Sequence, residues 1–320
     1  MITHLAHSAS EIKDSESAVQ FRSKSSGAFP RALTLISVIL IIAMLAVVLG
    51  IILFGGVRVI SWEFLSSPPE NGMEEGGIFP AIFGTVALVF LMVITGVPIG
   101  VLTAIYLHEF TRPDSKITRI IRLAINNLAG VPSIVFGLFG LGFFVAFIGT
   151  GIDSAFFGSG RPVWGQPAII WASLTLALLT LPVVIISTEE ALKTIPRELK
   201  DASYALGATK LQTIGRVILP QAMPGIITGA ILAISRGAGE VAPIMFTGAA
   251  YYLPYLPLKL NDQFMELGYH VYVMATQSPD VEKTKPILFG TVLVLLVLIF
   301  LLNFVAIFIR SRLRMRRMHG

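Results

Sequence analysis

Six long apolar segments constrain what this chain can fold into more than any other feature of its sequence. They cover about residues 32–54, 78–107, 121–149, 167–188, 222–249 and 286–309. Each is long enough to cross a bilayer core of roughly 30 Å as an α-helix. Only 13% of the 320 residues are charged, against roughly 25% in soluble domains. The sequence therefore predicts an all-α polytopic membrane protein with six transmembrane helices.

Lysine and arginine residues concentrate in alternate connecting segments. Most of them lie in the polar tail at residues 1–31, in the loops after spans two and four, and in the basic tail at residues 310–320. Cationic residues are enriched on the cytoplasmic side of membrane proteins. We therefore expect both tails to be cytoplasmic, on either side of a transmembrane domain at residues 32–309. The formal net charge of +5 belongs to these flanks, so nucleic-acid binding is not predicted.

The composition excludes several kinds of chemistry. Cysteine is absent, which rules out a disulfide framework, a thiol nucleophile and a thiolate metal site. The five histidines are scattered along the chain and form no metal-ligand cluster. No phosphate-binding loop of the form G-x-x-x-x-G-K-[ST] occurs, so the chain is not expected to hydrolyse ATP itself. We predict no metal site, no bound cofactor and no catalytic residue.

The fifth span carries two charges in the sequence ILAISRGAGEVAPIMF. Arg236 and Glu240 are four residues apart, with Gly237 and Gly239 between them. Ionisable side chains inside a membrane are expensive and usually pair with one another. Three interpretations follow. The pair joins helices or subunits, or Arg236 lines a path for an anion that its guanidinium matches bidentately, or the pair is a gate that separates during a conformational change.

Glycine and proline interrupt the third span at Ala129-Gly130-Val131-Pro132-Ser133. Backbone groups that such a kink frees inside a membrane need polar partners. Asn126 and Asn127 precede the kink and Ser133 follows it. These three side chains can each donate a hydrogen bond to an anion, so they are further candidates for a polar path through the membrane.

The cytoplasmic loop at residues 189–220 is too patterned to be a mere connection. It reads EEALKTIPRELKDASYALGATKLQTIGRVILP. Pro196 favours a helix start and Gly207 a helix end, while Thr209 caps a second helix that Pro220 is expected to end. These two short amphipathic helices expose apolar side chains, so we expect them to dock onto a partner.

This loop resembles the EAA loop of bacterial ABC-importer permeases. The matching residues are Asp201-Ala202-Ser203, Gly207 after three residues, and Val217-Ile218-Leu219-Pro220 after nine more. The usual form is Glu-Ala-Ala, three residues, Gly, nine residues and Ile-x-Leu-Pro. The resemblance implies the fold of type I importer permeases, with coupling helices that sit in a cleft of a cytoplasmic ATPase subunit. It assigns this coupling role to Asp201, Ala202, Ser203, Gly207, Leu219 and Pro220.

Three further stretches are similar to the PstA family of permease subunits in bacterial phosphate-specific ABC importers. They are SWEFLSSPPENGMEEGGIFPAIFGT, NLAGVPSIVFGLFG and ISRGAGEVAPIMFTGA. The resemblance implies a protein of the bacterial cytoplasmic (inner) membrane that transports inorganic phosphate as a heterodimer with the sister permease PstC. The implied partners are two PstB ATPase subunits, which bind ATP and Mg, and the phosphate-binding protein PstS.

The resemblance also places Arg236 and Glu240 in the translocation pathway, which favours the anion-path interpretation of the pair. One departure concerns Ile186, where related sequences often carry an arginine before Thr-Thr-Glu. A phosphate path that used this arginine would need a cation from elsewhere in the present protein. We expect the partner subunit to supply it.

Two alternative functions remain open. A permease for another oxyanion would keep the same architecture and change only the transported ion. An ion-coupled secondary transporter would also use interrupted helices and charges near the midplane. The sequence shows no convincing internal repeat, however, and such a transporter would not need the EAA loop. ATP-driven import of phosphate is therefore the predicted function.

Overall fold

The computed structural model describes residues 28–320, except residues 113–114, 159, 161, 279 and 319–320. Most of the predicted tail at residues 1–31 thus lies outside the described residues. The longest helices are α2 (Ala28–Gly56), α4 (Phe79–Ile105), α8 (Ile169–Lys193), α11 (Leu219–Gly237) and α14 (Val281–Met318). The shorter helices are α3 (Trp62–Ser66), α5 (Lys116–Ala129), α6 (Ser133–Gly140), α7 (Thr150–Phe156), α9 (Arg197–Ala205), α10 (Lys210–Thr213), α12 (Ile244–Thr247) and α13 (Leu267–Gln277). The π-helical turns are η2 (Tyr106–Phe110), η3 (Leu141–Gly149) and η4 (Ile214–Ile218).

Six helical segments of the described chain are long and apolar enough to cross a membrane. They are Phe29–Gly56, Phe79–Phe110, Ser133–Phe156, Ile169–Lys193, Lys210–Gly237 and Val281–Arg312. This confirms the predicted number of spans and the helical class. Among the described residues, two short strands, β1 (Pro69–Glu70) and β2 (Glu75–Gly76), form a small antiparallel hairpin, and one isolated bridge joins Ala249 to Phe264. The first span, α2, is apolar around its whole circumference, which is typical of a helix surrounded by lipid.

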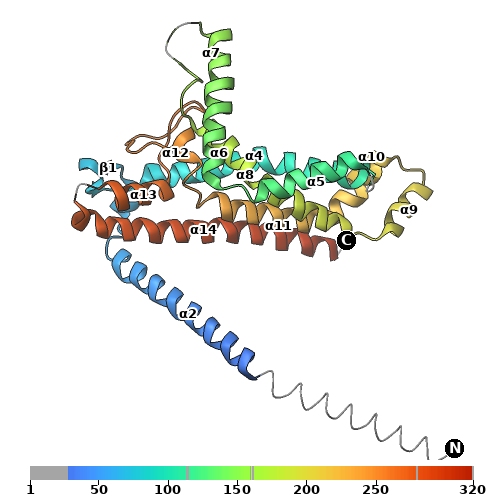
Figure 1. The fold of residues 1–320 in the computed structure, drawn as a ribbon, viewed down its shortest axis with the longest axis horizontal. Coiled ribbons are helices and arrows are strands. Elements are labelled where there is room, and N and C mark those ends of the chain that lie inside the picture. The colour runs from blue at the N-terminus through green and yellow to red at the C-terminus, as the bar shows by residue number, and fades with distance from the viewer. Residues whose placement is uncertain (1–27, 113–114, 159, 161, 279, 319–320) are drawn as a thin grey trace, which may run out of the picture. The chain divides into compact units, whose positions relative to one another are not determined.

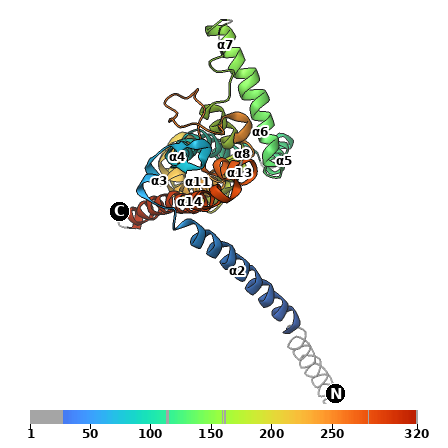
Figure 2. The ribbon, with the colours of Figure 1, turned by 90° about the vertical axis from the view of Figure 1, so that its left-hand side faces the viewer.

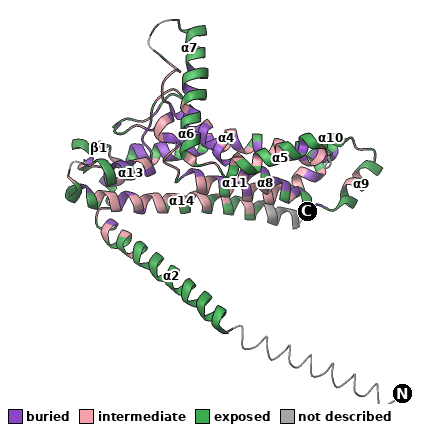
Figure 3. Cartoon of the chain, viewed as in Figure 1, coloured by how far each residue is buried: buried purple, intermediate pink, exposed green. Residues whose placement is uncertain are grey.

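Four of the long helices, α4, α8, α11 and α14, run along a common direction and form the bundle (Figures 1 and 2). α8 is the most buried of the six spans, and its purple turns lie inside the bundle in Figure 3. Small residues allow neighbouring backbones to approach it. A Cβ added to Gly96 of α4 would lie 3.2 Å from Ala177, and one added to Gly229 of α11 would lie 2.9 Å from Ser187.

The third span differs from its prediction at residues 121–149. The first part of that range belongs to α5, a separate amphipathic helix, and the membrane-spanning segment is Ser133–Phe156. The break between them has a local cause, because Pro132 lacks an amide donor and disfavours helical backbone angles at Val131. In Figure 1, α6, η3 and α7 form one helix that points away from the bundle, while α5 lies along it.

The fifth span also differs from its prediction at residues 222–249. Pro220 does not end the preceding helix, since α10, η4 and α11 continue without interruption from Lys210 to Gly237. The π-helical turn η4 ends at Ile218, two residues before Pro220. Such a turn changes the hydrogen-bond register close to a proline, which lacks an amide donor. At the other end, the helix stops at Gly237, and residues 238–243 are irregular.

The two ends of the bundle carry different structures (Figure 1). α9, α10 and the C-terminal end of α14 lie at one end, whereas the β1–β2 hairpin and α13 lie at the other. The basic tail predicted at residues 310–320 begins as a continuation of α14, which remains helical to Met318. The predicted topology places α9 and the end of α14 on the cytoplasmic side, and the fold brings them to the same side.

Candidate functional site

Arg236 and Glu240 lie at the point where α11 ends. Gly237 is the last helical residue, and a Cβ there would collide with the Met92 side chain of α4. Gly239, in contrast, has no neighbouring atom of the described chain within 4 Å of an added Cβ. The first glycine thus serves close packing, and the second leaves open space beside the two charges.

The two side chains form the predicted ion pair. A spacing of four residues would place them on one face of a continuous helix, but α11 ends at Gly237 and Glu240 lies beyond it. Arg236 Nε donates to Glu240 Oε1 at 3.4 Å, and Glu240 reaches it from the irregular segment after the helix. This long contact uses one of the five N–H donors of the guanidinium. Within the described residues, the Arg236 side chain makes no other hydrogen bond. Since 35% of this side chain is accessible, its free donors can reach an anion.

The other predicted pathway residues lie in a different part of the molecule. Asn126 and Asn127 are exposed on α5, and Ser133 is the half-buried first residue of α6. Among the described residues, no hydrogen bond or ion pair links any of the three to Arg236. The structure therefore brings Arg236 and Glu240 together and leaves the polar residues around the kink apart from them.

Asn126 instead lines a pocket of about 210 Å³ between α5 and α8. Arg122 and Glu189 line the same pocket and form an ion pair, with Arg122 Nη2 3.2 Å from Glu189 Oε1. Ile186 is also part of its wall. A cation of this chain, Arg122, thus lies in the same pocket as Ile186, where the resemblance predicted an arginine. The expectation that the partner subunit supplies a cation for the phosphate path stays a prediction.

The helix boundaries predicted in the coupling segment at residues 189–220 are confirmed at Gly207 and Thr209. Gly207 follows α9 with a φ of +79°, a left-handed conformation that favours glycine. Thr209 caps α10 through a reciprocal pair of hydrogen bonds with Gln212, the arrangement known as a capping box. Local sequence signals therefore determine the turn between the two short helices.

The predicted coupling residues fall into two groups: Asp201, Ala202, Ser203 and Gly207 on α9 and its turn, and Leu219 and Pro220 at the start of α11. α9 has no buried residue, and Leu206 beside its end is 89% exposed. Ser203 Oγ lies 2.9 Å from Thr213 Oγ1 of α10 and joins the two short helices. Leu219 packs against the apolar cluster that contains Ile218. The first group forms an exposed surface, and the second anchors it to the bundle.

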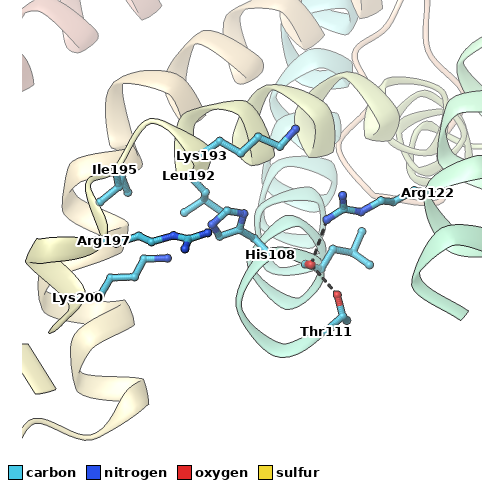
Figure 4. A pocket seen from close by; sticks show the side chains of 9 residues that line it. His108, Thr111, Arg122, Leu192, Lys193, Ile195, Arg197 and Lys200 are labelled. Atoms are coloured by element: carbon cyan, nitrogen blue, oxygen red, sulfur yellow. Dashed lines mark hydrogen bonds between the residues drawn. The ribbon is translucent and has the colours of Figure 1, made fainter. Parts of the chain in front are cut away.

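A second group of cations lines a pocket of about 420 Å³ (Figure 4). Its lining residues are Leu107, His108, Thr111, Arg122, Leu192, Lys193, Ile195, Arg197 and Lys200. In Figure 4, Arg197 and Lys200 point from α9 toward His108 on η2, and Arg122 donates from α5 to Leu107 O at 3.3 Å. The sequence marked these cations only as indicators of topology, because segments far apart in the chain supply them.

Three carboxylates neutralise most of the cations in this pocket. The pairs are Lys200 with Glu109, Arg122 with Glu189 at 3.2 Å, and Lys193 with Glu190 at 2.6 Å. Arg197 is different. Its side chain forms no ion pair and no hydrogen bond within the part of the chain that the structure describes. The pocket therefore retains a guanidinium whose donors are free.

One buried carboxylate lies outside the membrane spans and was not predicted. Glu266 is 2% exposed and caps α13, where it accepts hydrogen bonds from the N–H groups of Gly268 and Tyr269 at 2.8 and 2.6 Å. Burial raises the pKa of Glu266 to about 7, although these N–H groups act in the opposite direction. Glutamate is not among the preferred capping residues, so the sequence carried no clear signal for this site.

Comparison with protein families matches residues 96–317 to the family described as binding-protein-dependent transport system inner membrane component. The probable ABC transporter permease protein YqgI of Bacillus subtilis is 34% identical over 76% of this chain and 82% of that protein. The probable phosphate transport system permease protein PstA of Methanocaldococcus jannaschii is 36% identical over 73% of this chain and 76% of that protein. The phosphate transport system permease protein PstA 1 of Mycobacterium tuberculosis is 38% identical over 53% of this chain, and the match spans 50% of its length.

Two solved structures have a similar fold. A chain of the bacterial alginate ABC transporter, in complex with its alginate-bound periplasmic protein, aligns with a TM-score of 0.62 and 16% identity. That alignment covers 86% of this chain and 91% of the other. A chain of the inward-facing MetNI methionine ABC transporter aligns with a TM-score of 0.53 and 21% identity, over 73% of this chain and 94% of the other. At these identities the likeness concerns the fold alone.

Proposed function

The chain belongs to the family of binding-protein-dependent transport system inner membrane components, and from this membership we propose that it is the permease subunit of an ATP-driven phosphate importer. It is a multi-pass protein of the inner membrane that does not catalyse a reaction itself. ATP hydrolysis belongs to a separate ATPase subunit, and a substrate-binding protein delivers the cargo. Family membership disfavours an ion-coupled secondary transporter.

The free donors of Arg236 are the observation that carries the phosphate assignment. A guanidinium matches two phosphate oxygens with parallel N–H bonds, and Glu240 occupies only the Nε side at 3.4 Å. The carboxylate competes with the anion for the same guanidinium, so phosphate binds in transit without being trapped. The relatives named as phosphate transport permeases support this choice of substrate.

The exposed surface of α9 is proposed to dock into the ATPase and to transmit its movement to the bundle. Asp201 and Ala202 lie on this surface, and the continuous helix from Lys210 to Gly237 connects it to Arg236. We propose that the partners are the sister permease PstC, two PstB subunits that bind ATP and Mg, and the phosphate-binding protein PstS. The contact of α9 with PstB then links ATP hydrolysis mechanically to the end of α11.

Uptake of labelled phosphate by the complete complex in proteoliposomes tests the proposal. We expect Arg236→Met to reduce ATP-driven uptake about tenfold or more, because charge-assisted hydrogen bonds contribute roughly 1.5–3 kcal/mol. Arg236→Lys should restore part of the activity, since an ammonium keeps the charge and loses the bidentate geometry. The matched control is Arg119→Met, which removes an exposed cation of α5 and should leave uptake unchanged.

Two results would contradict the proposal. Full uptake by an assembled Arg236→Met complex would show that the residue only packs helices. Competition by unlabelled sulfate that exceeds competition by phosphate or arsenate would identify the protein as a permease for another oxyanion, with the same architecture.

A further inference from the structure

We propose that the pocket lined by Arg122, Lys193, Arg197 and Lys200 binds a phosphate group on the cytoplasmic side of the membrane. The pocket is separate from Arg236, which lies at the opposite end of α11 from the coupling segment. One possible ligand of this pocket is free inorganic phosphate, the ion that the protein is proposed to transport, and to this extent the inference rests on the proposed function.

The charge of the pocket favours an anion. Four cationic side chains line it, and a fifth, Lys210, lies next to it with its Nζ 2.5 Å from Glu109 O. Three carboxylates pair with the lining cations, and Arg197 has no partner among the described residues. An arginine fork that is free of partners fits phosphate oxygens bidentately.

The walls of the pocket strengthen this attraction. Leu107, Leu192 and Ile195 are buried and form its apolar part. Charges interact more strongly next to apolar, low-dielectric walls than in bulk water. A volume of about 420 Å³ accommodates free phosphate with water molecules, or the phosphate of a larger molecule.

Two sources can supply the phosphate group. One is free inorganic phosphate that has been imported. The other is a lipid with a phosphate monoester headgroup, because α5 carries Arg122 together with the exposed apolar residues Ile117 and Ile120. In either case the ligand would bridge Arg197 on α9 and Arg122 on α5. It would thereby hold the coupling helix against the bundle and make coupling sensitive to the ligand's concentration.

Equilibrium binding to the complete, nucleotide-free complex without its binding protein tests the inference. Nanodiscs of phosphatidylcholine are titrated with labelled inorganic phosphate, and a parallel set contains phosphatidic acid, whose retention is measured by mass spectrometry. We expect Arg197→Met to weaken binding at least about tenfold, by the energy of a charge-assisted hydrogen bond. The affinity of Arg197→Lys should lie between that of the wild type and that of Arg197→Met. Arg119→Met should bind like the wild type, and the component of binding that depends on Arg197 should persist in Arg236→Met.

Each outcome decides between the possibilities. Arg197-dependent binding of inorganic phosphate in phosphatidylcholine supports a site for the free ion, and Arg197-dependent retention of phosphatidic acid supports a site for the headgroup. Equal binding by wild type and Arg197→Met, or no binding of either ligand, overturns the inference. If wild-type complexes import phosphate while the pocket binds nothing, only the pocket is refuted. If the pocket binds phosphate while uptake fails, the proposed function is refuted instead.

Discussion

Because glycine has no Cβ, Gly237 allows α11 to contact α4 at the membrane-embedded end of the helix. The Met92 side chain occupies the space that a Cβ would need. Directly after this contact the chain leaves the helix, and Glu240 meets Arg236 from an irregular segment. The pair that the sequence predicted thus forms with a different geometry, in which most donors of the guanidinium remain free.

Glu266 should make stability depend on pH. The pKa of Glu266 is about 7 in the folded protein, against 4.5 for an ordinary glutamate. The folded protein therefore binds this proton more tightly than the unfolded chain does. The stabilising contribution is complete below pH 4.5 and is lost as the pH rises through 7. We expect this loss to be on the order of 3 kcal/mol and to be smaller in Glu266→Gln, as measured by thermal unfolding of the purified complex between pH 4.5 and 8.

Glu70→Gln provides the control for this prediction, because Glu70 is an exposed carboxylate on the same end of the molecule. Its pH profile should follow that of the wild type. An unchanged profile in Glu266→Gln would show that Glu266 does not titrate in this range.

At the scale of elements, the coupling segment depends on one turn between α9 and α10. Gly207 and Gly215 both face open space within the described chain, but only Gly207 has a positive φ, of +79°. Gly215 lies in the π-helical turn η4. Substitutions at these two glycines therefore separate the effect of backbone conformation from that of side-chain volume.

We expect Gly207→Ala to destabilise the coupling segment by about 1–2 kcal/mol, because a Cβ is unfavourable in the left-handed region. Gly215→Ala should stabilise it by up to about 1 kcal/mol, through the higher helix propensity of alanine. Copurification of the ATPase subunit and uptake should fall in Gly207→Ala alone. Equal losses in both variants would mean that the surface itself, rather than the turn, requires glycine.

At the scale of the whole molecule, the bundle carries the coupling helices α9 and α10 at one end and α13 with the β1–β2 hairpin at the other (Figure 1). The natural absence of cysteine makes its orientation directly measurable. Leu206 beside α9 is 89% exposed, and Leu258 before α13 is 86% exposed. A single cysteine at either position adds one reactive thiol to an otherwise thiol-free chain.

We expect a membrane-impermeant maleimide to label Leu258→Cys in intact cells and Leu206→Cys only after the membrane is opened. The positive-inside distribution of Lys and Arg is the physical reason. Labelling of Leu206→Cys from outside would show that the topology is the opposite of the predicted one. The proposed phosphate pocket would then lie on the wrong side of the membrane to bind the imported ion.

The sequence by itself determined the number of membrane spans and the position of the coupling turn. Three features depend only on consecutive residues: the length of an apolar run, the left-handed conformation at Gly207 and the cap at Thr209. They can therefore be predicted without knowledge of the tertiary structure. The prediction that the second coupling helix ends at Pro220 was wrong, because the helix continues through this proline after the π-helical turn η4. The third span was misplaced because the kink at Pro132 separates two helices instead of bending one.

Only the tertiary structure decided which distant residues meet. Arg122, Lys193 and Arg197 line one pocket because the fold brings parts of α5, α8 and α9 to it, although in the linear sequence they are only charges in two separate loops. The burial of Glu266 likewise depends on the packing of α13 against α4. Burial and charge convergence arise from contacts between segments far apart in the chain, and local patterns of residues do not encode those contacts.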